Sequence, residues 1–147
     1  MATVLELRRR AGLSQRELAE LSGVAQPNIA AYESGRRRPS PRMLERLEAA
    51  AKPRPSMLLT QHARAVTAIA RKHNAVDVRV FGSVARGDDR PGSDVDLLVT
   101  FATTATLYDQ VALTDELEAL LGIHVDVVSS AGLGARHDNI GREARPL

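Results

Sequence analysis

The sequence predicts two domains of different fold class: an all-α N-terminal domain, and an α/β or α+β C-terminal domain with a mixed sheet. Apolar residues recur with helical spacing as far as Ala51, whereas strand and helix patterns alternate after that point. Charge divides in the same way, since residues 1–56 carry eleven Lys and Arg against six Asp and Glu, and residues 57–147 carry nine against twelve. The Lys-Pro-Arg-Pro-Ser segment at residues 52–56 resists helix formation. We therefore predict domains over residues 1–52 and 57–147, joined by a linker over residues 53–56.

The N-terminal domain is expected to contain four short helices. Ser14 followed by Glu17 has the spacing of a capping box at the start of the second helix, and Gly23 marks the end of that helix. Pro27 falls in the first turn of the third helix, where no backbone N–H is needed. A Gly-Arg-Arg-Arg-Pro segment then ends the third helix, and Pro41 leads into the fourth.

The C-terminal domain is expected to alternate helices with strands. Helical periodicity predicts helices over residues 57–73 and 107–121. Runs rich in β-branched residues predict strands over residues 76–81, 94–101 and 123–128. Residues 134–147 could add a short helix, although Gly141 and Pro146 disfavour it.

Composition narrows the chemistry. The chain has no cysteine, so it has no disulfide and no thiolate metal site, and oxygen or imidazole ligands would have to hold any metal. It has no run of about 18 apolar residues and lacks the long apolar core of a signal peptide near its start. We therefore expect a cytosolic protein that does not bind membranes. The basic first part suits a polyanionic partner, and the acidic second part suits a bound cation.

A helix-turn-helix pattern lies in the N-terminal domain. Its letters are Leu-Ser-Gln-Arg-Glu-Leu-Ala at residues 13–19, Gly-Val at residues 23–24, Ile29, and Tyr-Glu-Ser-Gly-Arg at residues 32–36. In residue type and spacing the pattern resembles the XRE, or phage-repressor-like, helix-turn-helix family. The resemblance implies that the third helix enters the major groove of double-stranded DNA by its N-terminal end. Because one such module binds weakly, we expect a two-fold dimer on a palindromic operator.

The same resemblance implies two kinds of DNA contact. The residues that would face bases are Gln26, Pro27, Asn28 and Ala31. Among these, the amides of Gln26 and Asn28 can pair bidentately with adenine, which is worth about 1–3 kcal/mol each against a wrong base. The residues that would contact phosphates are Gln15, Arg16, Arg36, Arg37 and Arg38. The alternative is that the arginines form a solvated surface and the helices serve only as a scaffold or a dimerisation module.

A second motif lies in the C-terminal domain. It consists of Gly-Ser at residues 82–83, ten further residues, and Asp-Val-Asp at residues 94–96. Alternate side chains of a strand share a face, so Asp94 and Asp96 would converge on one site while Val95, Leu97 and Val99 point into the core. If Asp126 of the next strand pairs alongside, the carboxylates repel by about 3 kcal/mol per pair at an effective dielectric constant of 20. A divalent cation would relieve that repulsion.

This motif resembles the Gly-Ser-x10-Asp-x-Asp signature of the DNA polymerase β-like nucleotidyltransferase superfamily, and specifically the minimal nucleotidyltransferases. The resemblance implies that a hydroxyl attacks the α-phosphate of ATP and that pyrophosphate leaves. The implied catalytic and metal-binding residues are Asp94, Asp96 and Asp126, with two Mg²⁺ ions roughly 3.5–4 Å apart. The implied nucleotide-binding residues are Gly82, Ser83 and Arg86.

Other polar residues near the motif have simpler interpretations. Asp88 and Asp89 are interpreted as parts of a polar turn. The same interpretation is an alternative for Asp94 with Asp96, but two acids in an otherwise apolar strand are poor choices for packing. His124 would share a face with Asp126 and could line the site, but we interpret it as an ordinary strand histidine.

The resemblance also implies a biological role. Minimal nucleotidyltransferases are known mainly as antitoxins that transfer AMP to a tyrosine hydroxyl of a HEPN-type ribonuclease toxin. We therefore expect ATP, such a toxin and operator DNA as partners, with repression of the protein's own operon and assembly as a homodimer or a hetero-oligomer with the toxin. Two alternatives are nucleotidyl transfer to a small molecule, such as an aminoglycoside, and a regulator that senses nucleotide without catalysis.

Overall fold

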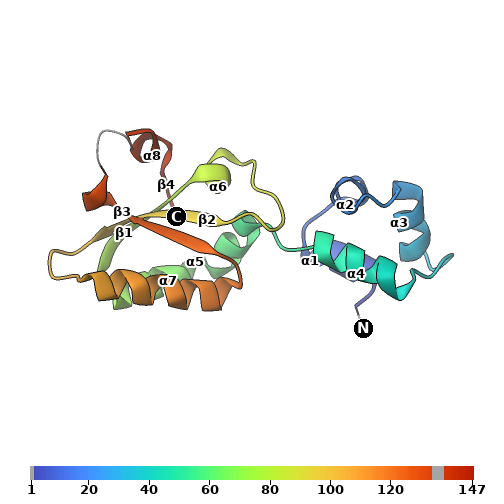
Figure 1. Ribbon diagram of the computed structural model, residues 1–147, viewed down its shortest axis with the longest axis horizontal. Coiled ribbons are helices and arrows are strands. Elements are labelled where there is room, and N and C mark those ends of the chain that lie inside the picture. Colours follow the sequence, from blue (N-terminus) through green and yellow to red (C-terminus); the bar gives the residue numbers. More distant parts are fainter. Residues whose placement is uncertain (1, 134–137) are drawn as a thin grey trace. The chain divides into compact units, whose positions relative to one another are not determined.

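The computed structural model describes residues 2–133 and 138–147. The chain divides into two compact units, one ending at Arg54 and the other starting at Pro55, and each unit has its own hydrophobic core (Figure 1). Among the described residues, no helix has the length and apolar character needed to cross a membrane.

The N-terminal unit is all-α, and the four predicted helices are confirmed. They are α1 (Val4–Arg10), α2 (Gln15–Ser22), α3 (Gln26–Glu33) and α4 (Pro41–Ala50). Ser14 and Glu17 form the predicted capping box of α2, and Gly23 ends that helix with a left-handed φ of 70°. Leu18, Ile29 and Leu47 are fully buried between the helices. Local sequence signals are therefore sufficient to place the helix-turn-helix elements.

A half-buried ion pair ties three of these helices together. The Glu33 carboxylate accepts hydrogen bonds from Arg8 Nε at 2.5 Å and from Gln15 Nε2 at 2.8 Å. The side chains of Arg8 and Glu33 are only 17% and 8% exposed. The hydrogen bond from Arg8, together with that from Gln15, holds the pKa of Glu33 below its ordinary value although burial acts in the opposite direction. Glu33 is therefore charged and paired in the folded unit.

We expect Glu33→Ala to lower the unfolding free energy of the N-terminal unit by about 3–5 kcal/mol, because it leaves the Arg8 charge buried without a partner. Urea unfolding followed by circular dichroism measures this loss. Glu20→Ala is the matched control, since Glu20 and Arg16 pair at 3.6 Å with side chains that are 70% and 85% exposed; its expected cost is under about 0.5 kcal/mol. Equal losses in the two variants would contradict the prediction.

The same pair predicts a pH dependence. Because the pKa of Glu33 is depressed in the folded state, its stabilising contribution is fully present above the ordinary glutamate pKa and is lost as the pH falls through the depressed value. The gap between the melting temperatures of the unaltered protein and Glu33→Ala should therefore narrow in acid. A gap that stays constant from neutral pH to below pH 3 would contradict this.

The C-terminal unit contains the predicted mixed sheet, and helices lie on both of its faces. Its elements are α5 (Pro55–Lys72), β1 (Ala75–Phe81), α6 (Gly82–Arg86), β2 (Val95–Phe101), α7 (Leu107–Leu121), β3 (Val125–Ser129), a 3₁₀ turn η1 (Ser130–Gly132), α8 (Asp138–Glu143) and β4 (Arg145–Pro146). The strand order is β3-β2-β1-β4, with β2 and β3 parallel and the other pairs antiparallel. Helices α5 and α7 cover one face of the sheet, and α6 and α8 lie over the other (Figure 1).

The alternation predicted for the second strand is confirmed. Val95, Leu97 and Val99 are completely buried and join the core that α5 and α7 complete. Because successive side chains of a strand point to opposite faces, Asp96 is directed toward the face that carries α6. The core of this unit therefore determines which face is left for polar chemistry.

The structure differs from the sequence prediction at several boundaries. Helix α5 starts at Pro55, so two of the four predicted linker residues belong to its first turn, a position where proline is favoured. Asp89, interpreted as a turn residue, is 6% exposed and accepts a hydrogen bond from the Ser56 N–H at 2.9 Å. This bond satisfies one of the N–H groups at the start of α5 that have no partner within the helix. The sequence offers no local signal for it, since 33 positions separate the two residues.

The third predicted strand starts two residues late, at Val125, and the second starts at Val95, so that Asp94 lies just before it. In the last segment, residues 134–147, the predicted short helix is α8. Strand β4 was not predicted. Residues 134–137 lie outside the described residues. The two residues of β4 have no strand pattern of their own, and they are defined only by pairing with Arg79 and Val80 of β1.

Candidate functional site

The candidate site forms where three strands bring their ends together. Strand β1 ends beside the start of β2 because the two are antiparallel, and β3 starts beside β2 because those two are parallel. In this register Asp96 lies between Phe81 of β1 and Asp126 of β3. Neighbouring strands are about 4.8 Å apart, so the carboxylates of Asp96 and Asp126 project from adjacent positions. Asp94 lies two residues before Asp96, at the entrance to β2.

Gly82 follows β1 and packs against Asp96. It has a φ of 72°, a left-handed conformation that favours glycine. A Cβ atom at this position would lie 2.3 Å from Asp96 Oδ2 and 3.1 Å from Asp96 Cγ. The position therefore requires glycine for two independent reasons, its backbone angle and the space that the Asp96 carboxylate occupies.

The carboxylates of the site repel one another. Burial, followed by the charges of Asp126 and Asp94, raises the pKa of Asp96 above its ordinary value, and Arg86 offsets only part of this effect. The cluster is therefore electrostatically unfavourable by itself. A bound cation would relieve the repulsion and favour the charged form of Asp96.

The donor set fits a hard divalent cation such as Mg²⁺. Carboxylate oxygens are the ligands that such cations prefer; Asp96 and Asp126 are register partners on adjacent strands, and Asp94 lies two residues before Asp96. Within the described part of the chain, no three acidic or histidine side chains already surround one point closely enough to form a ready metal centre. The residues therefore match the ion in chemistry and charge, although the described side chains do not form a complete coordination shell.

Arg86 and Glu143 flank the Gly-Ser turn. Gly82 and Ser83 begin α6, and Arg86 ends it. Glu143 of α8 accepts hydrogen bonds from Arg86 Nη1 at 2.7 Å and from the Gly82 N–H at 3.2 Å. Asp88 accepts a longer bond from Arg86 Nε at 3.4 Å. Sequence reasoning missed Glu143 because nothing local links it to a turn that lies 61 residues earlier in the chain.

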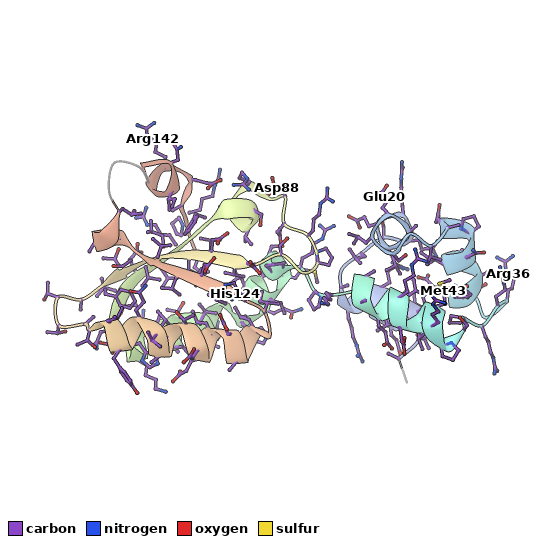
Figure 2. The ribbon with its side chains drawn as sticks, in the orientation of Figure 1. Glu20, Arg36, Met43, Asp88, His124 and Arg142 are labelled. Atoms are coloured by element: carbon purple, nitrogen blue, oxygen red, sulfur yellow. The ribbon has the colours of Figure 1, made fainter. Side chains whose placement is uncertain are left out.

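His124 lies at the edge of the site. Its Nε2 is 3.3 Å from Asp126 Oδ1, and its Nδ1 is 3.1 Å from Glu118 Oε1. Burial alone would lower the pKa of His124, but the charges of Asp126, Asp94 and Glu118 outweigh it and raise that pKa. Figure 2 labels this side chain just before β3. His124 precedes the strand, so the interpretation as an ordinary strand histidine is wrong.

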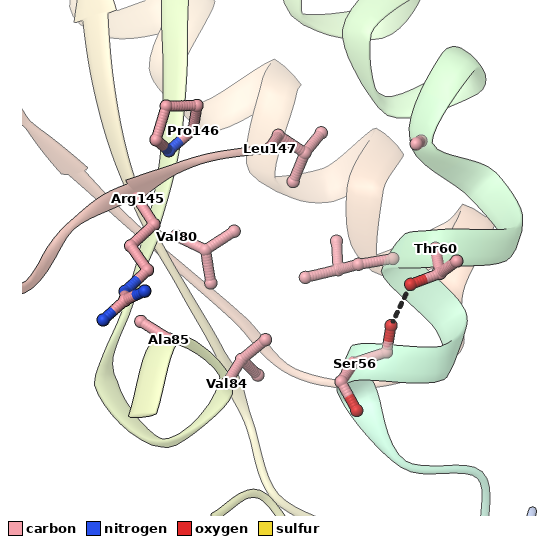
Figure 3. A pocket seen from close by; sticks show the side chains of 10 residues that line it. Ser56, Thr60, Val80, Val84, Ala85, Arg145, Pro146 and Leu147 are labelled. Atoms are coloured by element: carbon pink, nitrogen blue, oxygen red, sulfur yellow. Dashed lines mark hydrogen bonds between the residues drawn. The ribbon is translucent and has the colours of Figure 1, made fainter. Parts of the chain in front are cut away.

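A separate cavity lies between α5, β1, α6 and residues 145–147. Its volume is about 430 Å³, and its lining is mostly apolar, with Leu59 of α5, Val80 of β1, Val84 of α6 and Leu147 among the residues that form it (Figure 3). None of the lining residues is an acid, and none belongs to the predicted site. The candidate chemistry therefore lies at the carboxylate cluster and not in this cavity.

The residues predicted to read bases lie at the start and along one side of α3. Gln26 and Pro27 are exposed, whereas Asn28 and Ala31 are partly exposed. Asn28 Oδ1 accepts a hydrogen bond from Arg37 Nη1 at 3.0 Å, so its amide would have to leave this arginine to pair bidentately with a base. Gln26 is thus the more accessible of the two amides.

The residues predicted to contact phosphate differ in their exposure and in their hydrogen bonds within the N-terminal unit. Arg16, Arg36, Arg37 and Arg38 are exposed, and Figure 2 shows Arg36 projecting from the loop after α3. Gln15 is half-buried, donates to Glu33 and accepts a bond from Gln26 Nε2 at 3.5 Å. The amide of Gln15 therefore links the ion pair of the unit to Gln26.

The fold and the carboxylate cluster define a class of protein: a helix-turn-helix unit followed by a nucleotidyltransferase-type α/β unit. The chain belongs to the nucleotidyltransferase domain family, whose model matches residues 63–146, and a helix-turn-helix model matches residues 4–52.

Relatives and solved structures agree with this assignment. Protein adenylyltransferase MntA of Thermococcus cleftensis is 44% identical over 57 residues, which are 39% of this chain and 58% of that protein. A solved structure described as a minimal nucleotidyltransferase is 52% identical with a TM-score of 0.55, and the match covers 61% of this chain and 95% of that chain. A toxin-antitoxin structure with AMP-PNP shares the fold at 20% identity and a TM-score of 0.50, over 56% of this chain and 69% of that one.

Proposed function

We propose that the chain is an antitoxin nucleotidyltransferase that transfers AMP from ATP to a tyrosine hydroxyl of a cognate HEPN-type ribonuclease toxin. The observation that carries the proposal is the register that sets Asp96 beside Asp126, next to a Gly82 that has no room for a side chain. The name of the Thermococcus cleftensis relative, protein adenylyltransferase, supports ATP as the nucleotide and a protein as the acceptor.

Each residue has a distinct role in the proposed reaction. The acceptor oxygen forms a bond to the α-phosphorus of ATP, and the bond between that phosphorus and the bridging oxygen to the β-phosphate breaks, so that pyrophosphate leaves. Asp126 accepts the hydroxyl proton. Asp94 and Asp96, with Asp126, would hold Mg²⁺, which when bound supplies positive charge to the α-phosphate. Ser83 and Arg86 bind the β- and γ-phosphates, and Gly82 lets the backbone approach them.

The decisive experiment incubates the purified protein with Mg²⁺ and ATP, with and without the product of the neighbouring gene, and measures intact mass. We expect a gain of one or more AMP units on that partner, and no gain with the Asp94→Asn, Asp96→Asn variant. AMP transfer to a small molecule without any partner would favour the alternative acceptor. Complex formation and ATP binding without any transfer would favour a regulator that only senses nucleotide.

We also propose that the N-terminal unit binds operator DNA as a dimer and represses the operon. Gln26→Ala should weaken binding to the specific operator by about 1–3 kcal/mol and leave non-specific binding unchanged, because Gln26 is the exposed amide at the start of α3. Arg36→Ala, the control, should weaken binding to all sequences alike and reduce the salt dependence. Titrations on operator and scrambled duplexes measure both effects. An unchanged specificity ratio in Gln26→Ala would contradict this assignment.

A further inference from the structure

The carboxylate of Glu143 lies beside the candidate site and has no role in the proposed reaction. Glu143 ends α8, and its two oxygens bind opposite ends of α6: Oε2 accepts from the Gly82 N–H at 3.2 Å, and Oε1 accepts from Arg86 Nη1 at 2.7 Å. Its side chain is 28% exposed. The Glu143 carboxylate therefore bridges the two ends of α6, at Gly82 and Arg86, and both of these residues are predicted to bind the nucleotide.

The hydrogen bonds to Glu143 leave other donors of Arg86 and the hydroxyl of Ser83 available to phosphate. An arginine has five N–H donors on three nitrogens. Arg86 uses Nε toward Asp88 and Nη1 toward Glu143, and no hydrogen bond between described residues uses its Nη2. None of the hydrogen bonds between described residues uses the Ser83 hydroxyl. The guanidinium is thus held at two nitrogens while the third stays available to an anionic oxygen.

Charge supports the same arrangement. The hydrogen bond from Arg86, together with that from the Gly82 N–H, lowers the pKa of Glu143, so Glu143 and Arg86 form an ion pair at neutral pH. A guanidinium fixed in this way has already lost side-chain freedom that would otherwise be lost when a ligand binds. Fixing Arg86 before the nucleotide arrives would therefore strengthen nucleotide binding.

We propose that Glu143 is a positioning residue, which holds Arg86 and the Gly82-Ser83 turn in the arrangement that receives the triphosphate of the nucleotide. The inference rests on the proposed function, since it takes Arg86 and Ser83 as phosphate ligands. The opposite role for Glu143 is competition with phosphate for Arg86, and in that case removing the Glu143 carboxylate would tighten nucleotide binding.

The test is calorimetric titration of the full chain with AMP-PNP in the presence of Mg²⁺. Glu143→Ala should raise the dissociation constant about tenfold, and Glu143→Gln should raise it less, because glutamine keeps an oxygen that can accept from the Gly82 N–H. Asp115→Asn is the charge-matched control on an exposed position of α7, and it should change nothing. Glu143→Gln preserves side-chain volume, so it keeps the test valid if Glu143→Ala loses its fold.

A double-mutant cycle separates positioning from general stability. If Glu143 acts through Arg86, then Glu143→Ala should have little further effect on the dissociation constant in an Arg86→Ala background. Full additivity of the two changes, or tighter nucleotide binding by Glu143→Ala, would overturn the inference and leave the proposed function standing. No binding of AMP-PNP by the unaltered protein would instead overturn the proposed function itself.

Discussion

Gly82→Ala should reduce the proposed AMP transfer by at least about 10²-fold, because the added methyl group would lie 2.3 Å from Asp96 Oδ2 and would force that carboxylate to move. A displacement of about 1 Å at a reacting centre is enough for such a loss. The left-handed φ of 72° adds strain of about 1–2 kcal/mol for any L-residue with a side chain. Initial rates of transfer to the partner, together with a melting curve, measure both effects.

Gly122→Ala is the matched control for this substitution. Gly122 has a φ of 69° at the end of α7, and a Cβ atom there would meet nothing within 4 Å. It should therefore carry a similar backbone strain, lower the melting temperature to a similar extent, and leave transfer within about twofold of the unaltered protein. If the two variants lost the same fraction of activity, the effect would come from backbone strain and not from displacement of Asp96.

Asp96→Asn should strongly reduce the proposed AMP transfer and yet stabilise the fold when Mg²⁺ is absent. Removing one charge of the cluster eliminates a ligand of the proposed metal site, with a loss on the order of 10²–10³-fold. The same change removes a group whose pKa is raised by burial and by Asp126 and Asp94. We expect a melting temperature about 2–4 °C higher than that of the unaltered protein at neutral pH, a modest gain because the cluster is partly exposed to solvent.

The pH dependence of this gain has a definite sign. An acid whose pKa is raised by folding destabilises the folded state when it is ionised, so the penalty is fully present above the raised pKa and is absent below the ordinary aspartate pKa. The gain from Asp96→Asn should therefore be largest near neutral pH and shrink in acid. Adding Mg²⁺ should raise the melting temperature of the unaltered protein more than that of the variant. A lower melting temperature for Asp96→Asn in the absence of Mg²⁺ would contradict the prediction.

Several features followed from the sequence alone because their signals are local. The capping box of Ser14 with Glu17 and the proline in the first turn of α3 are satisfied within a few residues, so they place the helix-turn-helix elements before any packing is known. In the same way, a period of two in β2 directs Val95 and Leu97 into the core and leaves Asp96 on the opposite face.

Only the tertiary structure decided which distant groups meet. The position of Asp126 beside Asp96 depends on the parallel register of β2 and β3, which the alternation within either strand leaves open. The contacts of Asp89 with the start of α5 and of Glu143 with Gly82 and Arg86 span 33 or more residues. Such contacts arise when helices and strands pack around a shared core, because packing and not local backbone preference then sets the distances between side chains that are remote in sequence.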